Sequence, residues 1–300
     1  MKQRWVGRLA LSLIALTMVA VGCGDDGKTT STPTATTAST AGPPKFAAGT
    51  TMAAIQTKGK LVVGTKFDQP LFGLKNPTNN QVEGFDVEVA KIIARAIFGT
   101  DITNKVEYQE ATSKVRETVI QDGKVDIVVA TYTINDERKK VVDFAGPYYV
   151  AGQDILVKKA NTTITGVESL AGKKVCTVQG STSLTNVQKT APQADVSITF
   201  DKYSLCVEAL KDGRVEAVTT DNVILLGFIN DDPANLKLVN KPFTTEPYGI
   251  GLKKDDAAFR TFVNDTLEKA YKDGSWKKAW DDTAGKTGQA APTPPPVNRY

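Results

Sequence analysis

Short apolar runs alternate with segments of helical periodicity through the first half of the chain. Residues 60–66, 105–111 and 124–132 are short and apolar, as buried strands are. Residues 84–99 and 113–123 repeat apolar side chains at helical spacing, and both end at a glycine. The order is therefore βαβαβ, the pattern of a parallel sheet covered by helices on both faces.

The same alternation begins again further along the chain. Strands are predicted at 173–179, 196–200 and 215–220, and helices at 183–191, 203–213 and 221–230. The chain passes between the two sets near 146–158 and again near 239–255, after which helical segments return to the first set. We therefore expect an α/β fold of two lobes, each a mostly parallel sheet flanked by helices, joined by a two-strand hinge. Ligands bind such sheets at the carboxyl ends of the strands, so the cleft between the lobes is the expected site.

The N-terminus has the pattern of an export signal. A basic stretch is followed by 14 mostly apolar residues from Leu9 to Gly22 and then by Cys23. This run is too short for a helix to span about 30 Å of hydrocarbon, which indicates a signal peptide. The small residues before Cys23 resemble the lipobox of bacterial lipoproteins, in which the new N-terminal cysteine is lipidated. An ordinary secretory signal with an incidental cysteine is the alternative.

Both ends of the chain beyond this signal lack the side chains that form a core. The residues after Cys23 are rich in Thr, Ser, Pro and Gly, and the last residues are rich in Pro, so both are expected to be disordered. The expected organisation is a signal peptide at 1–22, a lipidated flexible tether at 23–55, the first lobe at 56–150, the second lobe at 151–242, a return to the first lobe at 243–285 and a disordered tail at 286–300.

Charge and composition exclude several functions. The formal net charge is +4, and without Lys2, Arg4 and Arg8 of the removed signal it is about +1. A nucleic-acid partner therefore has no electrostatic support. The chain contains no histidine, which excludes Ser-His-Asp and Cys-His nucleophile systems and His-ligated zinc. No cofactor and no metal ion are expected.

Two cysteines remain beyond Cys23. Export would place Cys176 and Cys206 in an oxidising compartment, where an even pair is expected to form a disulfide. Two buried free thiols are the alternative.

Residues 129–149, VATYTINDERKKVVDFAGPYY, contain a candidate anion site. Strand alternation places Thr131 and Thr133 on one side of the predicted strand. Arg138 then lies in the first turn of a helix, where a cation faces the positive end of the helix dipole unless an anion binds there. A carboxylate in a bidentate pair would suit it. Alternatively, neighbouring acids neutralise Arg138 or it extends into water.

The second lobe offers complementary candidates. Ser181 and Thr182 precede a helix, where free backbone amides could bind an anion. The alternative is that the segment is only a capping loop. Asp221 ends a strand and could hold an ammonium group or merely cap the next helix.

Two further candidates belong to the first lobe. Lys66 is by default a solvated lysine, and Phe72 is either a core residue or an aromatic lid. An anion site and a cation site near one α-carbon describe a zwitterionic amino acid.

At these residues the sequence resembles the extracellular solute-binding proteins of family 3, the amino-acid receptors of ABC importers. The resemblance covers about residues 58–285 and rests on four motifs: GFDVEVAKIIARAI, YTINDERKKVVDFAGPYY, VQGSTS and GRVEAVTTDN. It implies the type II periplasmic-binding-protein fold, and it implies that Arg138, Thr133 and Thr182 hold the substrate α-carboxylate while Asp221 holds the α-ammonium. Ala130 stands where several relatives carry Ser, and Asp86 is expected to cap its helix.

The segment GTKFDQPLFG, the cysteine pair and the Pro-rich tail look like the glutamate and glutamine receptors of actinobacteria. Lys66 lies where glutamate-binding relatives place a cation, which favours glutamate over glutamine, aspartate or asparagine. The resemblance implies a monomer without enzymatic activity, attached by lipid to the outer face of the cytoplasmic membrane, that delivers its amino acid to an ABC permease. A sensor that signals through a membrane partner is one alternative, and an enzyme resembling cyclohexadienyl dehydratase is another.

Overall fold

The computed structural model describes residues 43–300. The predicted signal peptide, the predicted lipidation site Cys23 and the predicted tether up to residue 42 therefore lie outside the described residues. The tether was predicted to extend to residue 55, which is wrong in its last part, because helix α1 begins at Thr51. Within residues 43–300, no helix is long and apolar enough to cross a membrane. Residues 43–300 belong to one compact unit.

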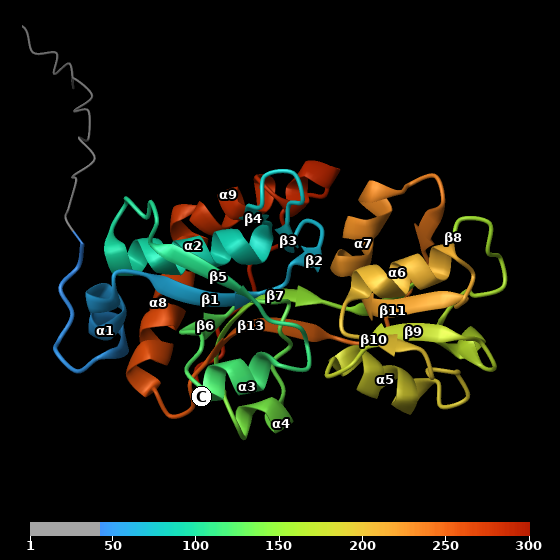
Figure 1. Ribbon diagram of the computed structural model, residues 1–300, viewed down its shortest axis with the longest axis horizontal. Coiled ribbons are helices and arrows are strands. Elements are labelled where there is room, and N and C mark those ends of the chain that lie inside the picture. Colours follow the sequence, from blue (N-terminus) through green and yellow to red (C-terminus); the bar gives the residue numbers. More distant parts are fainter. Residues whose placement is uncertain (1–42) are drawn as a thin grey trace, which may run out of the picture. The chain divides into compact units, whose positions relative to one another are not determined.

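The first lobe is built on a five-stranded sheet of order β5-β1-β6-β13-β7. Its strands are β1 (Leu61–Thr65), β5 (Val106–Glu110), β6 (Ile127–Val128), β7 (Asp143–Ala151) and β13 (Glu246–Leu252). β1 pairs in parallel with β5 and β6, whereas β13 runs antiparallel to β6 and β7. The sheet is therefore mixed, with β13 running opposite to the other four strands. The chain passes between the lobes through β7 and β13 (Figure 1).

Helices cover both faces of this sheet. They are α1 (Thr51–Lys58), α2 (Phe85–Phe98), α3 (Arg116–Gln121), α4 (Asp136–Lys139), α8 (Ala257–Asp273) and α9 (Ser275–Asp281), followed by the 3-10 turn η2 (Ala284–Thr287). Phe85 from α2 packs against Trp276 and Trp280 of α9 in the main core, while Tyr132 and Phe144 belong to the core on the other face. A small antiparallel sheet of β2 (Asp68–Gln69), β3 (Gly73–Lys75) and β4 (Val82–Glu83) lies before α2.

The second lobe has a sheet of order β10-β9-β11-β8-β12. Its elements are β8 (Gln153–Lys158), η1 (Val167–Leu170), β9 (Val175–Val178), α5 (Thr182–Thr190), β10 (Thr199–Phe200), α6 (Tyr203–Lys211), β11 (Ala217–Asp221), α7 (Asn222–Asp231) and β12 (Leu236–Leu238). β9, β10 and β11 are parallel, whereas β8 pairs antiparallel with both β11 and β12. Separate apolar clusters lie on the two faces of this sheet, which explains why its strands β9 and β11 are buried throughout.

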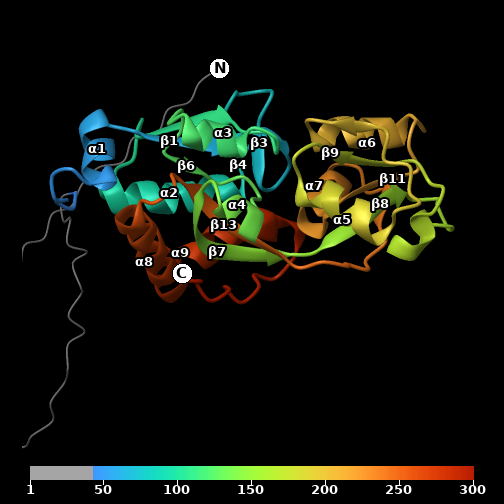
Figure 2. The same cartoon turned by 90° about the horizontal axis from the view of Figure 1, so that it is seen from below.

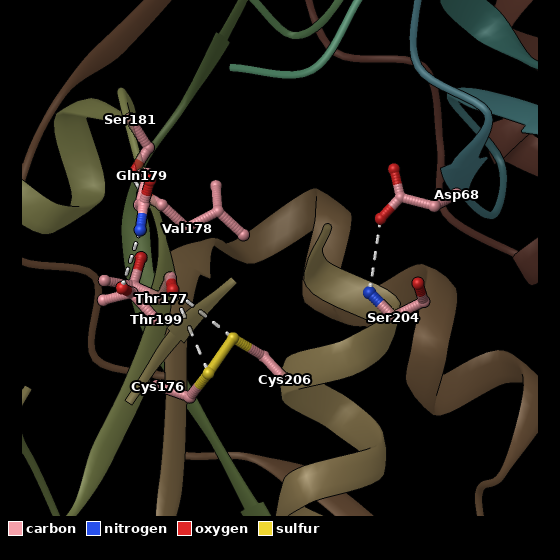
Figure 3. Close-up of a disulfide and its surroundings, with 9 residues drawn as sticks. All are labelled: Asp68, Cys176, Thr177, Val178, Gln179, Ser181, Thr199, Ser204 and Cys206. Carbon is pink, nitrogen blue, oxygen red and sulfur yellow. Dashed lines mark hydrogen bonds between the residues drawn. A yellow bond between two sulfur atoms is a disulfide. The ribbon is translucent and has the colours of Figure 1, made fainter. Parts of the chain in front are cut away.

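A disulfide joins Cys176 of β9 to Cys206 of α6, as predicted (Figure 3). Both cysteines are fully buried, so the bond fixes α6 against its own sheet from inside the core. Two residues before Cys206, the amide of Ser204 donates to Asp68 of the first lobe at 3.2 Å. The disulfide therefore anchors a helix whose start contacts the opposite lobe.

The lobes meet through backbone as well as side chains. A Cβ added at Gly180 would lie 2.5 Å from the Cα of Lys114, and one added at Gly227 would lie 2.5 Å from the carbonyl oxygen of Pro70. Gly180 also has a positive φ of 72°, whereas Gly227 lies inside α7. Glycine at 227 is therefore required by the approach of the other lobe and not by its own backbone conformation.

We expect Gly227→Ala to hold the two lobes apart. Alanine should stabilise α7 itself by about 0.5–1 kcal/mol, because glycine is the poorer helix former. Small-angle X-ray scattering should nevertheless show a larger radius of gyration than for the wild-type protein. Asn230→Ala, at an exposed position of the same helix, is the control and should leave the radius unchanged. An unchanged radius for Gly227→Ala would mean that this contact does not limit closure.

The C-terminal residues differ from the disordered tail that the sequence predicts for 286–300. The amide of Asn298 donates to the carbonyl of Gly146 at 2.8 Å, and the hydroxyl of Tyr300 accepts from the amide of Phe144 at 2.8 Å. Arg299 forms an ion pair with Asp265 of α8. The tail thus lies along β7, the edge strand of the first sheet, whose free backbone groups supply its partners (Figure 2).

Candidate functional site

A small cavity lies where the two lobes meet, and it contains much of the predicted site. Its volume is about 10 Å³, room for about one water molecule. Lobe 1 contributes Ser113, Arg116 and Thr131, and lobe 2 contributes Ser181, Thr182, Ser183, Tyr203, Thr220, Asp221 and Ile224. Most of these residues follow the carboxyl ends of β5, β6, β9 and β11, where ligand sites of parallel sheets are expected. In this conformation the lobes are too close to enclose an amino acid.

Arg138 is buried beside this cavity on α4. The side chain of Asn135 caps α4 by accepting from the amide of Arg138 at 2.9 Å. The guanidinium donates to the carbonyl of Thr133 at 2.7 Å and, across the interface, to the carbonyl of Gly180 at 3.1 Å. Glu117 lies 3.4 Å from its Nε. Burial and the nearby Arg116 lower the pKa of Arg138 to about 10, which leaves it charged at neutral pH.

The acids next to Arg138 in sequence do not neutralise it. Asp136 pairs with Lys139 and Glu137 with Lys140. Of the interpretations that the sequence leaves open, the structure therefore excludes both neutralisation by these neighbours and extension into water, because Arg138 is only 8% exposed.

Thr133 and Thr182 face each other across the interface, with their hydroxyls 3.5 Å apart. Both hydroxyls donate to the same carboxylate oxygen of Glu246, at 2.8 and 2.9 Å. Glu246 begins β13 and was not predicted as a site residue. The hydroxyls that the resemblance assigns to the ligand carboxylate thus already have an acceptor within the protein.

Ser181 is the N-cap of α5. Its hydroxyl accepts from the amide of Leu184 at 3.1 Å and donates to the carbonyl of Val178 at 2.7 Å. The capping interpretation therefore describes its side chain. The amides of Thr182 and Ser183 begin the helix and have no intrahelical acceptor, which leaves them available to an anion.

Asp221 is buried at the end of β11. One oxygen accepts from the hydroxyl of Tyr248 at 2.6 Å, while its Oδ1 has no hydrogen-bond partner among the described residues. The side chain makes no capping hydrogen bond to α7, so helix capping does not explain it. Burial, with the negative charge of Glu246 nearby, raises the pKa of Asp221 to about 7. A cationic donor is the partner that this carboxylate lacks.

Thr131 is held in an unusual backbone conformation at φ 44°. Asp86 accepts from its amide at 2.8 Å and from the hydroxyl of Tyr148 at 2.6 Å. The expectation that Asp86 caps its helix is wrong, because Gly84 is the N-cap and Asp86 braces Thr131. The same turn ends the predicted strand 124–132 early, so Thr131 and Thr133 do not alternate as in a regular strand.

Positive groups gather near Thr131. Lys66 is 2% exposed and donates to the hydroxyl of Ser113 at 2.8 Å. Burial and the charge of Arg116 lower the pKa of Lys66 to about 7. The Nε of Arg116 and the Nε2 of Gln69 have no partner among the residues that the structure describes. Lys66 is therefore no solvated lysine, and two donors beside it were missed by sequence reasoning.

Phe72 does not reach this cavity. Its ring packs edge-on against Phe85, Tyr149 and Tyr248 in the core of the first lobe. Of the two interpretations left open by the sequence, the structure supports the core residue, and the lid is wrong. The ring is fully buried in the main core cluster, which explains why it is not available as a lid.

Residues 61–282 match the family described as bacterial extracellular solute-binding proteins, family 3. The chain belongs to this family. This family member is 46% identical over 231 residues to the ABC transporter glutamine-binding protein GlnH of Bacillus subtilis, an alignment that spans 77% of this chain and 83% of the relative. It is 40% identical over 247 residues to the glutamate-binding protein GluB of Corynebacterium efficiens, covering 79% of this chain and 83% of that protein.

Solved structures agree with the fold of the family 3 protein. An ancestral arginine-binding protein bound to glutamine superimposes with a TM-score of 0.69 at 41% identity, covering 75% of this chain and 97% of that one. The expected type II periplasmic-binding-protein fold is thereby confirmed. Its members are extracellular proteins that bind solutes.

Proposed function

We propose that this protein captures a polar amino acid outside the cytoplasm by closure of its lobes and delivers it to an ABC importer. The observation that carries the proposal is that the interface contains both a buried cation and a buried carboxylate. The cation is Arg138, and the carboxylate is Asp221, one of whose oxygens lacks a partner in the described residues. The names of the relatives GlnH and GluB support an amino acid as the solute. Lipid attachment at Cys23 belongs to the same proposal.

The α-carboxylate is assigned to the Arg138 side of the cavity. Closing the lobes around a ligand would let the guanidinium exchange the carbonyls of Thr133 and Gly180 for a carboxylate, a stronger acceptor. The first amides of α5, at Thr182 and Ser183, add donors at the positive end of a helix. The α-ammonium is assigned to Asp221, whose raised pKa reflects the missing positive charge.

The ligand side chain is assigned to the region of Lys66, Arg116 and Gln69. Every one of these residues offers a donor, and two of the donors have no acceptor among residues 43–300. A carboxylate would satisfy several of them at once, whereas an amide brings an NH₂ group that has no use for further donors. L-Glutamate is therefore the first candidate, followed by glutamine, aspartate and asparagine.

Lys66→Gln is expected to separate glutamate from glutamine. Removing the cation should weaken glutamate binding by about a hundredfold, since a hydrogen bond to a charged group contributes about 1.5–3 kcal/mol. Glutamine should lose less than tenfold. Isothermal titration calorimetry with all common amino acids measures the affinities for glutamate and glutamine. Lys75→Gln is the control, because Lys75 is an exposed lysine of the same lobe.

Equal losses for glutamate and glutamine would contradict the role of Lys66 in the side-chain site. No binding of any amino acid to the wild-type protein would contradict the proposed function itself.

The enzyme alternative depends on the same carboxylate. A carboxyl group with a pKa near 7 is suited to general acid catalysis, and Asp221 has one in this conformation. The pKa is raised by burial next to Glu246, and an ammonium ligand would lower it again. We therefore propose binding without chemistry. Product formation from arogenate or prephenate would overturn that choice.

A further inference from the structure

Glu246 lies where the chain re-enters the first lobe, and its carboxylate is 3% exposed. It accepts three hydrogen bonds from side chains of both lobes. Oε2 accepts from Thr133 of the first lobe and Thr182 of the second, at 2.8 and 2.9 Å, and Oε1 accepts from Nδ2 of Asn186 on α5 at 2.8 Å. One hinge-strand side chain thus connects the two walls of the cavity.

The second hinge strand is tied into the same network. Nδ2 of Asn186 also donates to Oε1 of Gln153, at the start of β8, at 3.0 Å. The amide of Gln153 donates to the hydroxyl of Thr244, two residues before Glu246, at 3.0 Å. The carboxylate of Glu246 is therefore fixed with respect to both crossings of the chain.

Two charged groups lie within electrostatic reach of Glu246. Its negative charge favours the charged form of Arg138 and raises the pKa of Asp221. Among the described residues, Glu246 forms no ion pair within 4.0 Å. Two of its three hydrogen bonds, those from Thr182 and Asn186 of lobe 2, exist only while the lobes are together, whereas Thr133 belongs to the same lobe as β13.

A threonine hydroxyl has a single proton to donate. In this conformation Thr133 and Thr182 both give theirs to Glu246, and the cavity beside them is too small for an amino acid. The contact therefore needs no amino acid to form. An amino acid can enter only after the lobes separate, and its carboxylate can then bind Arg138 and the backbone amides of Thr182 and Ser183.

We propose that Glu246 is an interlobe latch, a positioning residue whose carboxylate holds Thr133 and Thr182 together and stabilises the closed conformation without an amino acid. Because the closed cavity is too small for an amino acid, the latch lowers the fraction of protein that can bind, and binding requires the hydrogen bonds from Thr182 and Asn186 to break. Its effect on affinity rests on the proposed function, but its effect on lobe closure does not.

The first test compares Glu246→Gln with the wild-type protein by small-angle X-ray scattering without added amino acid. Glutamine keeps the shape of the side chain but offers one acceptor oxygen in place of two and carries no charge. We expect a larger radius of gyration for the variant and an unchanged one for Glu208→Gln, an exposed glutamate of α6. Equal radii for wild-type protein and Glu246→Gln would overturn the latch.

The second test measures glutamate binding kinetics by surface plasmon resonance. The variant should bind about tenfold more tightly, with most of the change in the association rate, because more of the protein is open before binding. Weaker binding, or unchanged binding, would show that Glu246 does not hold the protein in the closed conformation and would overturn the proposal. If no amino acid binds the wild-type protein, the proposed function fails while the scattering result still decides the latch.

Thr182→Val provides an independent variant if Glu246→Gln does not fold. It removes the hydroxyl from the second lobe and leaves the volume of the side chain nearly unchanged. The scattering change should match that of Glu246→Gln, and the double variant should add little to either single one, as expected for partners in one contact. Additive changes would mean that the two residues act separately.

Discussion

Arg138→Ala is expected to abolish binding of every amino acid. The α-carboxylate is common to all of them, and in a closed cleft it would be left without its cation. Truncating one partner of a buried charge pair removes roughly 3–5 kcal/mol, which corresponds to a loss of affinity of at least about a hundredfold. Isothermal titration calorimetry against glutamate and glutamine measures the loss.

Two comparisons make the Arg138 result specific. Lys140→Ala, on the exposed end of the same short helix, removes a cation paired only with Glu137 and should keep wild-type affinity. Arg138→Lys retains the charge but not the bidentate geometry, so it should recover part of the affinity at most. Full binding by Arg138→Ala would show that the carboxylate is held elsewhere, with Arg116 the nearest alternative cation.

The two-lobe fold and the disulfide followed from local pattern. Apolar runs of strand length separated by amphipathic segments suffice to predict two α/β sets, and an exported pair of cysteines suffices to predict the bond that joins β9 to α6. The reversed directions of β8 and β13 could not be predicted in the same way, because strand direction depends on how the chain crosses between lobes and not on periodicity.

The site was only partly readable from the sequence. Arg138 and Asp221 occupy strand ends or first helical turns, positions that a pattern can identify. Glu246 is 113 residues from Thr133 and meets it only through the pairing of β13. A single acid at the start of the strand EPYGIGL was the available signal, since a charge that begins a buried strand needs a partner.

The C-terminal tail was also only partly predictable from the sequence. Its Pro-rich composition correctly indicates an extended chain that cannot form a core of its own. The contact with β7 comes from the last residues, Asn298 to Tyr300, which bind an edge strand that composition does not reveal. The role of Phe72 could not be decided from the sequence for a related reason. An aromatic residue near a strand end can pack in a core or line a cleft, and only its contacts in the folded protein distinguish the two.

Asp221→Asn is expected to lose amino-acid binding while the folded protein becomes no less stable. The ammonium group would meet an uncharged amide, so affinity should fall by about a hundredfold or more. Without amino acid the substitution removes a buried carboxylate with an unpartnered oxygen, and the hydroxyl of Tyr248 can still donate to the amide oxygen. Calorimetry measures the first effect, and chemical denaturation without amino acid measures the second.

The pH dependence of that stability difference separates charge from shape. Burial raises the pKa of Asp221 from 3.8 to about 7, so the carboxyl group stabilises the folded protein when protonated and loses that contribution as pH rises from about 4 through 7. Asparagine does not titrate. The variant should therefore gain stability over the wild-type protein at pH 8 and show a smaller difference at pH 5. A gain that is larger at pH 5, or a loss at pH 8, would mean that the carboxylate of Asp221 is already compensated in the unliganded protein, and its assignment to the ammonium group would lose its physical basis.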